Sequence, residues 1–427
     1  MFAERRGARY NLIQRGQMKS TEIMSMIAAM LMVANSALSQ TWTPTTAPNE
    51  HWQAVASSAD GSKLIAGSEG LLYAISTNSG STWITNSQPQ YGSYYGSWSF
   101  VASSADGSIL VGIIANEIWV STNSGTTWFS NSVPVADFFA SVALSADGTK
   151  LVIVDGKQQN YPGVIYTSTN FGVTVAPTMA PTNYWQSVAS SADGTKLVAA
   201  EMNFSSQCGS IYASTNSGLT WGLTGAPTNN AWGTVASSVD GSKLLAASQT
   251  AYIPAQIYGG VYTSTNFGMT WTSNCVPAAQ WESVASSADG TRLVAVAIEP
   301  KGWIYTSTNS GITWVSNSVP NDSWVSVASS ADGGKMVVAP LGDQSFKPQP
   351  IYTLQTTPSP QLNLIPSSDN LVLSWGIPST NFVLQQSADL TLWATATNLY
   401  SLNLTNLRNQ MTLLPSSSST FYRLKTP

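Results

Sequence analysis

The sequence predicts an all-β protein, in which a seven-bladed β-propeller closed by the N-terminal strand is followed by a small β-sandwich domain. Two repeated phrases and the composition predict this fold. The phrase Ser-Thr-Asn-x-Gly-x-Thr-Trp occurs six times, whole or nearly whole, and the phrase Trp-x-x-Val-Ala-Ser-Ser-x-Asp-Gly recurs seven times. Only 9% of the residues are charged, so the chain is rich in strand and turn formers and poor in helix-forming Glu, Lys and Arg.

Residues 1–39 have the pattern of an export signal. Five basic residues precede an apolar run from Ile23 to Val33, and small residues before Gln40 offer a cleavage site. The alternative, a membrane anchor, is disfavoured because the run is too short to span comfortably. Translation from Met1 or from Met18 stays open. We therefore predict a secreted or cell-surface protein without a transmembrane anchor once the signal is removed.

The charge and the cysteines exclude several classes of function. Removal of the leader leaves 12 of 17 basic and 19 of 21 acidic residues, a net charge of −7. No basic patch remains for nucleic acid. Cys208 and Cys275 are too few for a disulfide framework or a zinc site, although a bridge between them stays open. We expect no nucleic-acid partner, no cofactor, no metal and a monomer.

Each repeat reads as four antiparallel strands. In the fourth copy, Trp185–Ser191 is rich in strand formers, Asp193-Gly194 makes a hairpin turn, and Lys196–Ala200 returns. A variable loop then leads to Ser210–Ser214, and Asn216-Ser217-Gly218 turns the chain into the fourth strand. The first aromatic residues of the seven copies lie 41 to 49 residues apart, at Trp52, Trp98, Phe139, Trp185, Trp232, Trp281 and Trp324.

The closure of the ring is also predicted. The seventh repeat loses the pattern after Thr353, before its fourth strand. A matching segment, Thr41-Trp42-Thr43-Pro44, precedes the first repeat. We predict that Trp42 pairs with the strand around Tyr352, because this closure leaves fewer exposed edges. The propeller then spans residues 40–355.

The remaining residues predict a linker and a second small domain. Residues 356–360 contain two prolines and read as a short stiff linker. Residues 361–427 alternate again, as in Leu371–Trp375 and Phe421–Leu424, and resemble a trimmed fibronectin type III module. Trp375 and Trp393 are its expected core. The resemblance implies a spacer, adhesion or sorting role rather than catalysis.

The six turn phrases resemble the Asp-box, or bacterial neuraminidase repeat, which reads Ser-x-Asp-x-Gly-x-x-Trp. Asn replaces the family's Asp in every copy, and the third copy ends in Val175 rather than Trp. Asn can make the same side-chain to backbone turn bonds without the charge. The residues expected to shape these turns are Asn78, Gly80, Asn123, Gly125, Asn170, Gly172, Asn216, Gly218, Asn266, Gly268, Asn309 and Gly311.

The resemblance implies the fold more strongly than an activity, because Asp-boxes occur in enzymes and in binding proteins alike. Sialidases of this family hold the substrate carboxylate with three arginines, whereas residues 41–355 contain only Arg292. Sialidase activity is therefore disfavoured. The photosystem assembly factors of the family use a patch of arginines, which these residues also lack. Xyloglucanase-like hydrolases need two carboxylates across a cleft, which this chain can supply, although they usually build that cleft from two propellers.

The alternation of strand direction defines two rims. The Asp-Gly and Asn-x-Gly turns lie on one, here called the repeat rim. The strand 2–3 loops and the connections between blades lie on the other, here called the variable rim, where binding residues are expected. Ten acids that do not belong to the Asp-Gly turns fall in or beside this rim: Glu50, Glu69, Glu117, Asp137, Asp155, Glu201, Glu282, Glu299, Asp322 and Asp343.

The candidate ligand-binding residues come from the variable rim: Glu69, Tyr91, Tyr94, Tyr95, Glu117, Asp155, Glu201, Glu282, Glu299 and Trp303. Aromatic rings stack on sugars and carboxylates accept hydroxyl bonds, so the ligand is predicted to be an extracellular glycan or protein. The alternative for any single acid is solvation in a loop. The repeated tryptophans are interpreted as packing between blades rather than ligand platforms.

Three functions are compatible with these residues. The first is a non-catalytic propeller that binds a glycan or protein. The second is a glycoside hydrolase whose acid and base are two carboxylates of the variable rim, with no catalytic residue assigned. The third is a purely structural envelope protein. Whether the chain is an enzyme stays open, and the first function is favoured.

Overall fold

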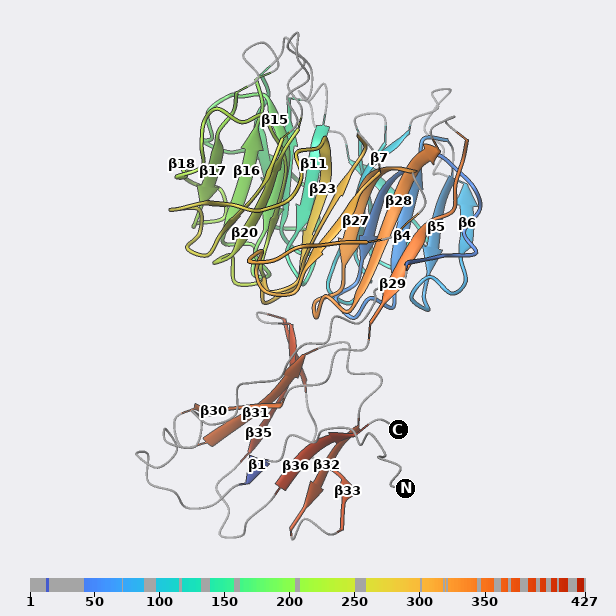
Figure 1. Cartoon of the computed structure of the whole chain (residues 1–427), viewed down its shortest axis with the longest axis vertical. Coiled ribbons are helices and arrows are strands. Elements are labelled where there is room, and N and C mark those ends of the chain that lie inside the picture. Colours follow the sequence, from blue (N-terminus) through green and yellow to red (C-terminus); the bar gives the residue numbers. More distant parts are fainter. Residues whose placement is uncertain are drawn as a thin grey trace, which may run out of the picture. The chain divides into compact units, whose positions relative to one another are not determined.

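A computed structural model describes most of the chain. The described residues are 13–14, 42–70, 72–87, 97–114, 117–131, 139–156, 162–203, 208–249, 259–299, 302–317, 319, 322–343, 347–356, 362–367, 370–376, 383–388, 392–396, 401–404, 407–413 and 421–425. Their regular structure is entirely β, in nine four-stranded sheets (Figure 1). They include no helix long and apolar enough to cross a membrane. The chain divides into two compact units, one of them Thr41–Thr357 with Leu404–Leu407.

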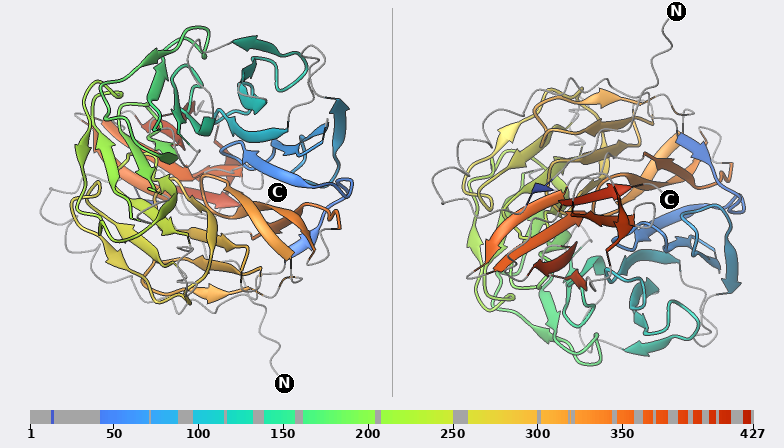
Figure 2. Two further views of the ribbon diagram at one scale, coloured as in Figure 1. Left: turned by 90° about the horizontal axis from the view of Figure 1, so that it is seen from above. Right: turned by 90° about the horizontal axis from the view of Figure 1, so that it is seen from below.

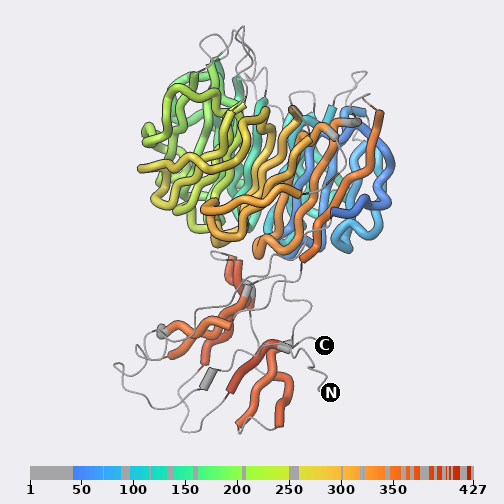
Figure 3. The backbone as a smooth tube through the Cα atoms, viewed as in Figure 1, coloured from blue at the N-terminus to red at the C-terminus, as the bar shows by residue number. Residues whose placement is uncertain are grey.

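Seven of the sheets are the predicted blades, and each pairs its strands in antiparallel order (Figures 1 and 3). Blade 1 contains β3 (Trp52–Ser57), β4 (Leu64–Ser68), β5 (Leu72–Ser76) and β6 (Ile84–Ser87). Blade 2 contains β7 (Trp98–Ser103), β8 (Leu110–Ile114), β9 (Glu117–Ser121) and β10 (Phe129–Asn131). Blade 3 contains β11 (Phe139–Leu144), β12 (Leu151–Asp155), β13 (Ile165–Ser168) and β14 (Ala176–Pro177).

The later blades repeat this order with a shorter fourth strand. Blade 4 contains β15 (Trp185–Ser190), β16 (Leu197–Glu201), β17 (Ile211–Ser214) and β18 (Gly222–Leu223). Blade 5 contains β19 (Trp232–Ser237), β20 (Leu244–Ser248), β21 (Val261–Ser264) and β22 (Thr272–Ser273). Blade 6 contains β23 (Trp281–Ser286), β24 (Leu293–Ala297), β25 (Ile304–Ser307) and β26 (Val315–Ser316). Blade 7 contains β27 (Asp322–Ser329), β28 (Lys335–Asp343), β29 (Tyr352–Gln355) and β2 (Trp42–Pro44).

The predicted closure is confirmed, because Trp42 pairs with Leu354 and Pro44 pairs with Tyr352 across β2 and β29. The second strands are largely buried, whereas the fourth strands are largely exposed. All five residues of β4, for example, are buried, whereas both residues of β18 are exposed. This gradient explains the continuous apolar sequences of the second strands, which neighbouring blades cover on both faces.

The blades are joined at the repeat rim by a closed ring of backbone hydrogen bonds. The N–H of Ala59 donates to the carbonyl of Ala105 in the next blade, and the series ends when Ala331 donates to Ala59. The seven bonds are 2.7 or 2.8 Å long and join Ala59, Ala105, Ala146, Ala192, Val239, Ala288 and Ala331. The seven blades are arranged around the axis of this ring (Figure 2).

The two turn classes are bonded to each other within each of blades 1 to 6, which confirms that they share one rim. In blade 1 the N–H of Ser79 donates to Ser62 O at 2.8 Å. Asn78 Oδ1 accepts from the N–H of Thr82 at 2.8 Å, and Asn78 Nδ2 donates to Thr82 Oγ1. Ser79 and Gly80 both have positive φ, 58° and 85°, a backbone conformation that the glycine adopts without strain.

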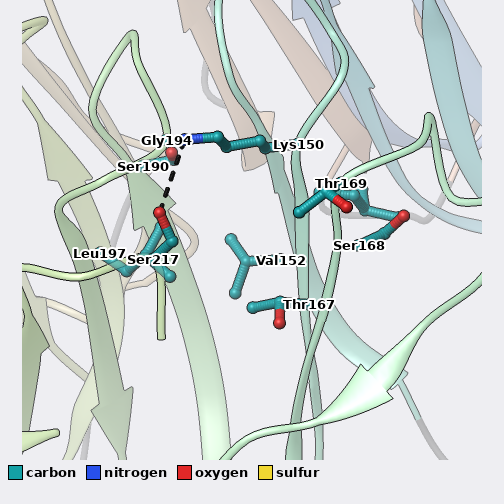
Figure 4. A pocket seen from close by; sticks show the side chains of 10 residues that line it. Lys150, Val152, Thr167, Ser168, Thr169, Ser190, Gly194, Leu197 and Ser217 are labelled. Carbon is teal, nitrogen blue, oxygen red and sulfur yellow. Dashed lines mark hydrogen bonds between the residues drawn. The ribbon is translucent and has the colours of Figure 1, made fainter. Parts of the chain in front are cut away.

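Six of the seven blades also carry a cation that reaches the next blade. Lys150 Nζ of blade 3 donates to Asp193 O at 2.8 Å and lies 3.5 Å from Ser217 Oγ, both in blade 4 (Figure 4). A Cβ on Gly194 would lie 2.6 Å from Lys150 Cδ, so glycine is required both for its positive φ and for this close approach. The equivalent cations are Lys63, Lys196, Lys243, Arg292 and Lys335. The crevices beside Lys63, Lys150, Lys243 and Lys335 measure about 10 to 20 Å³, room for little more than one water.

The second unit contains two further antiparallel sheets. One contains β30 (Leu362–Ser367), β31 (Asn370–Gly376), β35 (Arg408–Leu413) and β34 (Ser401–Asn403). The other contains β1 (Ile13–Gln14), β36 (Phe421–Lys425), β32 (Val383–Ser387) and β33 (Ala394–Thr395). Both sheets contribute to one apolar core.

The two tail tryptophans have different environments. Trp375 is 2% exposed and belongs to this core, as predicted. Trp393 does not belong to it. Its ring is half-buried under the Arg423 guanidinium, whose carbon lies 4.1 Å from the ring centroid. The expectation that Trp393 is a core residue is therefore wrong, since a cation–π contact holds it instead.

The seven turn aspartates differ in their titration. Burial raises the pKa of Asp60, but hydrogen bonds from Ser58 and Ser62 and the nearby Lys335 outweigh burial and leave that pKa lowered. Five other turn aspartates behave likewise. Asp332 is the exception, because burial leaves its pKa raised. Gly334 stands where the others have Ser or Thr, so Asp332 lacks that hydroxyl donor.

Asp60→Ala should lower the free energy of unfolding by about 1–2 kcal/mol at pH 7, because it removes the acceptor of the turn. A lowered folded-state pKa means that this contribution is present above about pH 4 and is lost as pH falls further. Urea titrations of parent and variant at pH 7 and below about pH 4 measure this contribution. An equal loss at pH 7 and at acid pH would contradict the assignment.

Asp332→Asn should have the opposite sign. A raised folded-state pKa means that the carboxyl favours folding at low pH and that this advantage disappears as pH rises through that pKa. The Asn variant should therefore be as stable as the parent at pH 7, or more stable by up to about 1 kcal/mol. Urea titration at pH 7 is the measurement, and a clear destabilisation would refute the argument.

Candidate functional site

The repeated tryptophans at the start of the inner strands are packing residues. Trp52, Trp98, Trp185, Trp232, Trp281 and Trp324 are 0% exposed. In blades 4 to 7 each packs edge-on against a tyrosine of its own blade; Trp185 and Tyr212, for example, have ring centroids 5.3 Å apart. These tryptophans therefore offer no surface to a ligand.

The residue after the first aromatic of each blade varies, with six residue types in the seven blades. A β-bulge lies at this position in all seven inner strands, at the end toward the variable rim. The residues are Gln53, Ser99, Ala140, Gln186, Gly233, Glu282 and Val325. The strict repeat is thus interrupted at the ends of the inner strands that face the variable rim. Bulges commonly redirect a side chain.

Glu282 occupies this bulge in blade 6 and contacts blade 5. Gln249 Nε2 donates to Glu282 Oε2 at 3.0 Å. Sequence reasoning selected Glu282 but missed Gln249, which directly follows β20. Its place directly after a second strand was the available signal, because the candidate Glu69 directly follows the second strand of blade 1.

Asp155 and Glu201 occupy equivalent places on neighbouring blades. Each ends a second strand and pairs with the first aromatic of its own blade, Asp155 with Phe139 and Glu201 with Trp185. Asp155 is 9% exposed. Burial raises the pKa of Glu201, and hydrogen bonds from Ser210 offset this only in part. Both acids therefore belong to strand ends rather than to solvated loops.

Glu117 is the most unusual of the candidate acids. It opens β9, pairs with Ile114 and is 9% exposed. Its Oε2 is buried and has no hydrogen-bond partner in the part of the chain that the structure describes. Blade 1 has Leu72 at the equivalent place. An orphaned carboxylate oxygen costs about 1–3 kcal/mol, so the acid is not explained by packing.

The interface between blades 1 and 2 departs from the repeat around Glu117. Tyr73 Oη donates to Gly125 O at 3.0 Å. In four other blades that carbonyl accepts the indole N–H of the strand 4 tryptophan, as Gly218 accepts from Trp221 at 3.1 Å. Trp128 consequently keeps a buried N–H without a partner among the described residues.

The other candidates are dispersed along the variable rim. Glu69 and Glu299 are exposed, and Trp303 is half-buried with its ring 6.1 Å from that of Tyr305. Tyr91, Tyr94 and Tyr95 lie outside the described residues. The structure thus brings Glu282 to Gln249, and it distributes the described candidates over blades 1, 2, 3, 4 and 6.

Metal and disulfide chemistry find little support. No group of three His, Cys, Asp or Glu suited to a metal occurs within the described ranges. Cys208 is half-buried, Cys275 is exposed, and both are free thiols. His51 Nδ1 lies 2.8 Å from Leu341 O and so donates its proton to blade 7, which gives it a structural role at the seam.

Comparisons with known proteins support the fold. No protein-family model matches the chain, and no curated protein does so. Among solved structures it is similar to YCF48 bound to D1 peptide, with 10% identity, a TM-score of 0.55, and coverage of 76% of this chain and 99% of that chain. Kuenenia stuttgartiensis hydrazine synthase gives 14% identity, a TM-score of 0.56 and coverage of 76% and 99%. YCF48 from Cyanidioschyzon merolae gives 14%, 0.53, and 74% and 98%. At these identities the likeness shows a β-propeller and no activity.

Glu117→Leu should raise the free energy of unfolding by about 1 kcal/mol, because it replaces an orphaned carboxylate with the residue type of blade 1. Chemical denaturation at pH 7 measures the change. Glu282→Leu is the control and should give no such gain, since the Glu282 carboxylate accepts a hydrogen bond. A Glu117 variant less stable than the parent would show that this acid serves packing after all.

Proposed function

We propose that this chain is an exported, non-catalytic propeller of the Asp-box type, whose variable rim binds an extracellular protein or glycan. The contrast between the two rims carries the proposal. At the repeat rim the aspartates, asparagines and lysines are consumed by bonds within and between blades. At the variable rim the non-repeating acids include Glu117, whose Oε2 has no hydrogen-bond partner among the residues that the structure describes. Binding residues commonly occupy such variable positions on a rigid scaffold.

The point at which the chain leaves the propeller also supports the variable rim as the binding surface. The N–H of Thr356 donates to Gly334 O at 2.6 Å, so the linker leaves the propeller beside the Asp-Gly turn of blade 7. A tail that starts at the repeat rim suits a spacer or attachment module of the fibronectin type III kind. The YCF48 structure that holds a D1 peptide makes a protein ligand a natural first candidate.

Display of glycan and peptide arrays to the full chain tests the proposal. We expect a bound ligand whose affinity falls at least about tenfold in the variant Asp155→Asn/Glu201→Gln/Glu282→Gln, because charge-assisted contacts contribute strongly to recognition. The matched control Asp147→Asn/Asp193→Asn/Asp240→Asn removes three charges from the repeat rim and should bind like the parent. Equal loss in both variants would place recognition elsewhere.

One observation keeps the hydrolase alternative worth testing. Burial raises the pKa of Glu201, as a general acid requires. Incubation of the chain with a polysaccharide panel should release no reducing sugar if the propeller only binds. Release that is abolished by Glu201→Gln would replace binding with glycoside hydrolysis.

Export predicts a definite mature N-terminus. Expression in a host with a general secretion pathway should give a secreted chain that begins at Gln40, as read by N-terminal sequencing. The structure pairs Ile13 with Tyr422 and Gln14 with Phe421, and cleavage would remove this two-residue edge strand. A chain that stays inside the cell with its leader intact would contradict the proposed export.

A further inference from the structure

We propose that the partner of the variable rim is a cationic protein segment, rich in lysine or arginine, rather than a neutral glycan. This inference rests on the proposed binding at that rim and specifies its chemistry. Three features of the chain support it. They are an unequal division of charge between the rims, acids fixed at strand ends, and one carboxylate oxygen without a partner within the described part of the chain.

The division of charge between the rims is unequal. The repeat rim contains seven aspartates and six cations, a net charge of −1. The segments at the variable rim contain the ten other acids but only Lys157, Lys301 and Lys347, a net charge of −7 with His51 neutral. A surface with one excess sign attracts ligands of the opposite sign and discriminates against like charge.

The acids are fixed on strands of four different blades. Glu117, Asp155, Glu201 and Glu282 belong to blades 2, 3, 4 and 6. In blade 7 the backbone places Asp322 directly opposite Asp343, at the far ends of β27 and β28.

Burial of the acids reduces the screening of their negative charge by water and salt. Glu117 and Asp155 are each 9% exposed, so water and salt screen them less than they screen a surface charge. Glu117 Oε2 has no donor among the described residues, which is independent of the count of acids. A neutral sugar hydroxyl compensates such a site weakly, whereas an ammonium or guanidinium supplies both a donor and the opposite charge.

Fluorescence anisotropy with labelled deca-lysine and the full chain tests the inference. Fully acetylated deca-lysine, deca-glutamate and the neutral glycans of the array serve as comparison ligands. Deca-lysine should bind, and raising sodium chloride from about 50 mM to about 500 mM should weaken binding at least tenfold. Asp155→Asn/Glu201→Gln/Glu282→Gln should weaken it about tenfold at the lower salt concentration.

The equal-charge control separates a site from general attraction to an acidic protein. Asp147→Asn/Asp193→Asn/Asp240→Asn carries the same net charge as the rim variant and should bind deca-lysine within about twofold of the parent. Equal weakening by both variants, or equal binding of the acetylated peptide, would overturn the inference. A glycan or neutral peptide that binds at the variable rim in place of deca-lysine would also overturn it and leave the proposed function standing. No binding of any ligand at that rim would remove both.

Discussion

The closed ring of seven backbone hydrogen bonds at the repeat rim is the constraint on which the rest of the propeller depends. Each of its residues donates to the next blade and accepts from the previous one, so the series is complete only when the seventh blade meets the first. Chains joined by such bonds lie about 4.8 Å apart, and seven of them enclose a circle about 11 Å across. The residues of the ring are six alanines and one valine, each of which directly precedes the Asp of an Asp-Gly turn.

The ring also determines where the protein can vary. The Asp-Gly turn presents its backbone to the next blade in all seven blades. In six of them a Lys or Arg stem passes close to the glycine of the next blade, and in blade 2 Ile109 takes this place. Among the described residues, no such ring joins the opposite ends of the inner strands. There the bulge after the aromatic accepts Gln, Ser, Ala, Gly, Glu or Val in different blades. Invariance at one rim and freedom at the other are thus two consequences of the same construction.

Sequence reasoning reached the features that repeat and missed those that break the repeat. Asp193-Gly194 and Trp42 were predictable because turn chemistry and strand pairing are local or periodic, and the structure confirms both. The burial of Glu117 and Asp155 was not predictable in this way. Acids beside loops suggest solvation, whereas the structure places both in strands covered by the neighbouring blade. The bond from Tyr73 to Gly125 was also out of reach, because one tyrosine at an isoleucine position changes a partner in the next blade.

The irregular interface between blades 1 and 2 has a physical meaning of its own. In an open stack of repeats, a weak interface lets the terminal unit fray, because each repeat contacts only its neighbours. A closed ring removes this route, since blade 2 cannot leave without breaking contacts on both sides. The ring therefore tolerates Glu117 Oε2 and the Trp128 N–H without partners among the described residues, at a cost that an open array would express as local unfolding. Closure thus gives stability and also permits unfavourable side chains at the rim where recognition is proposed.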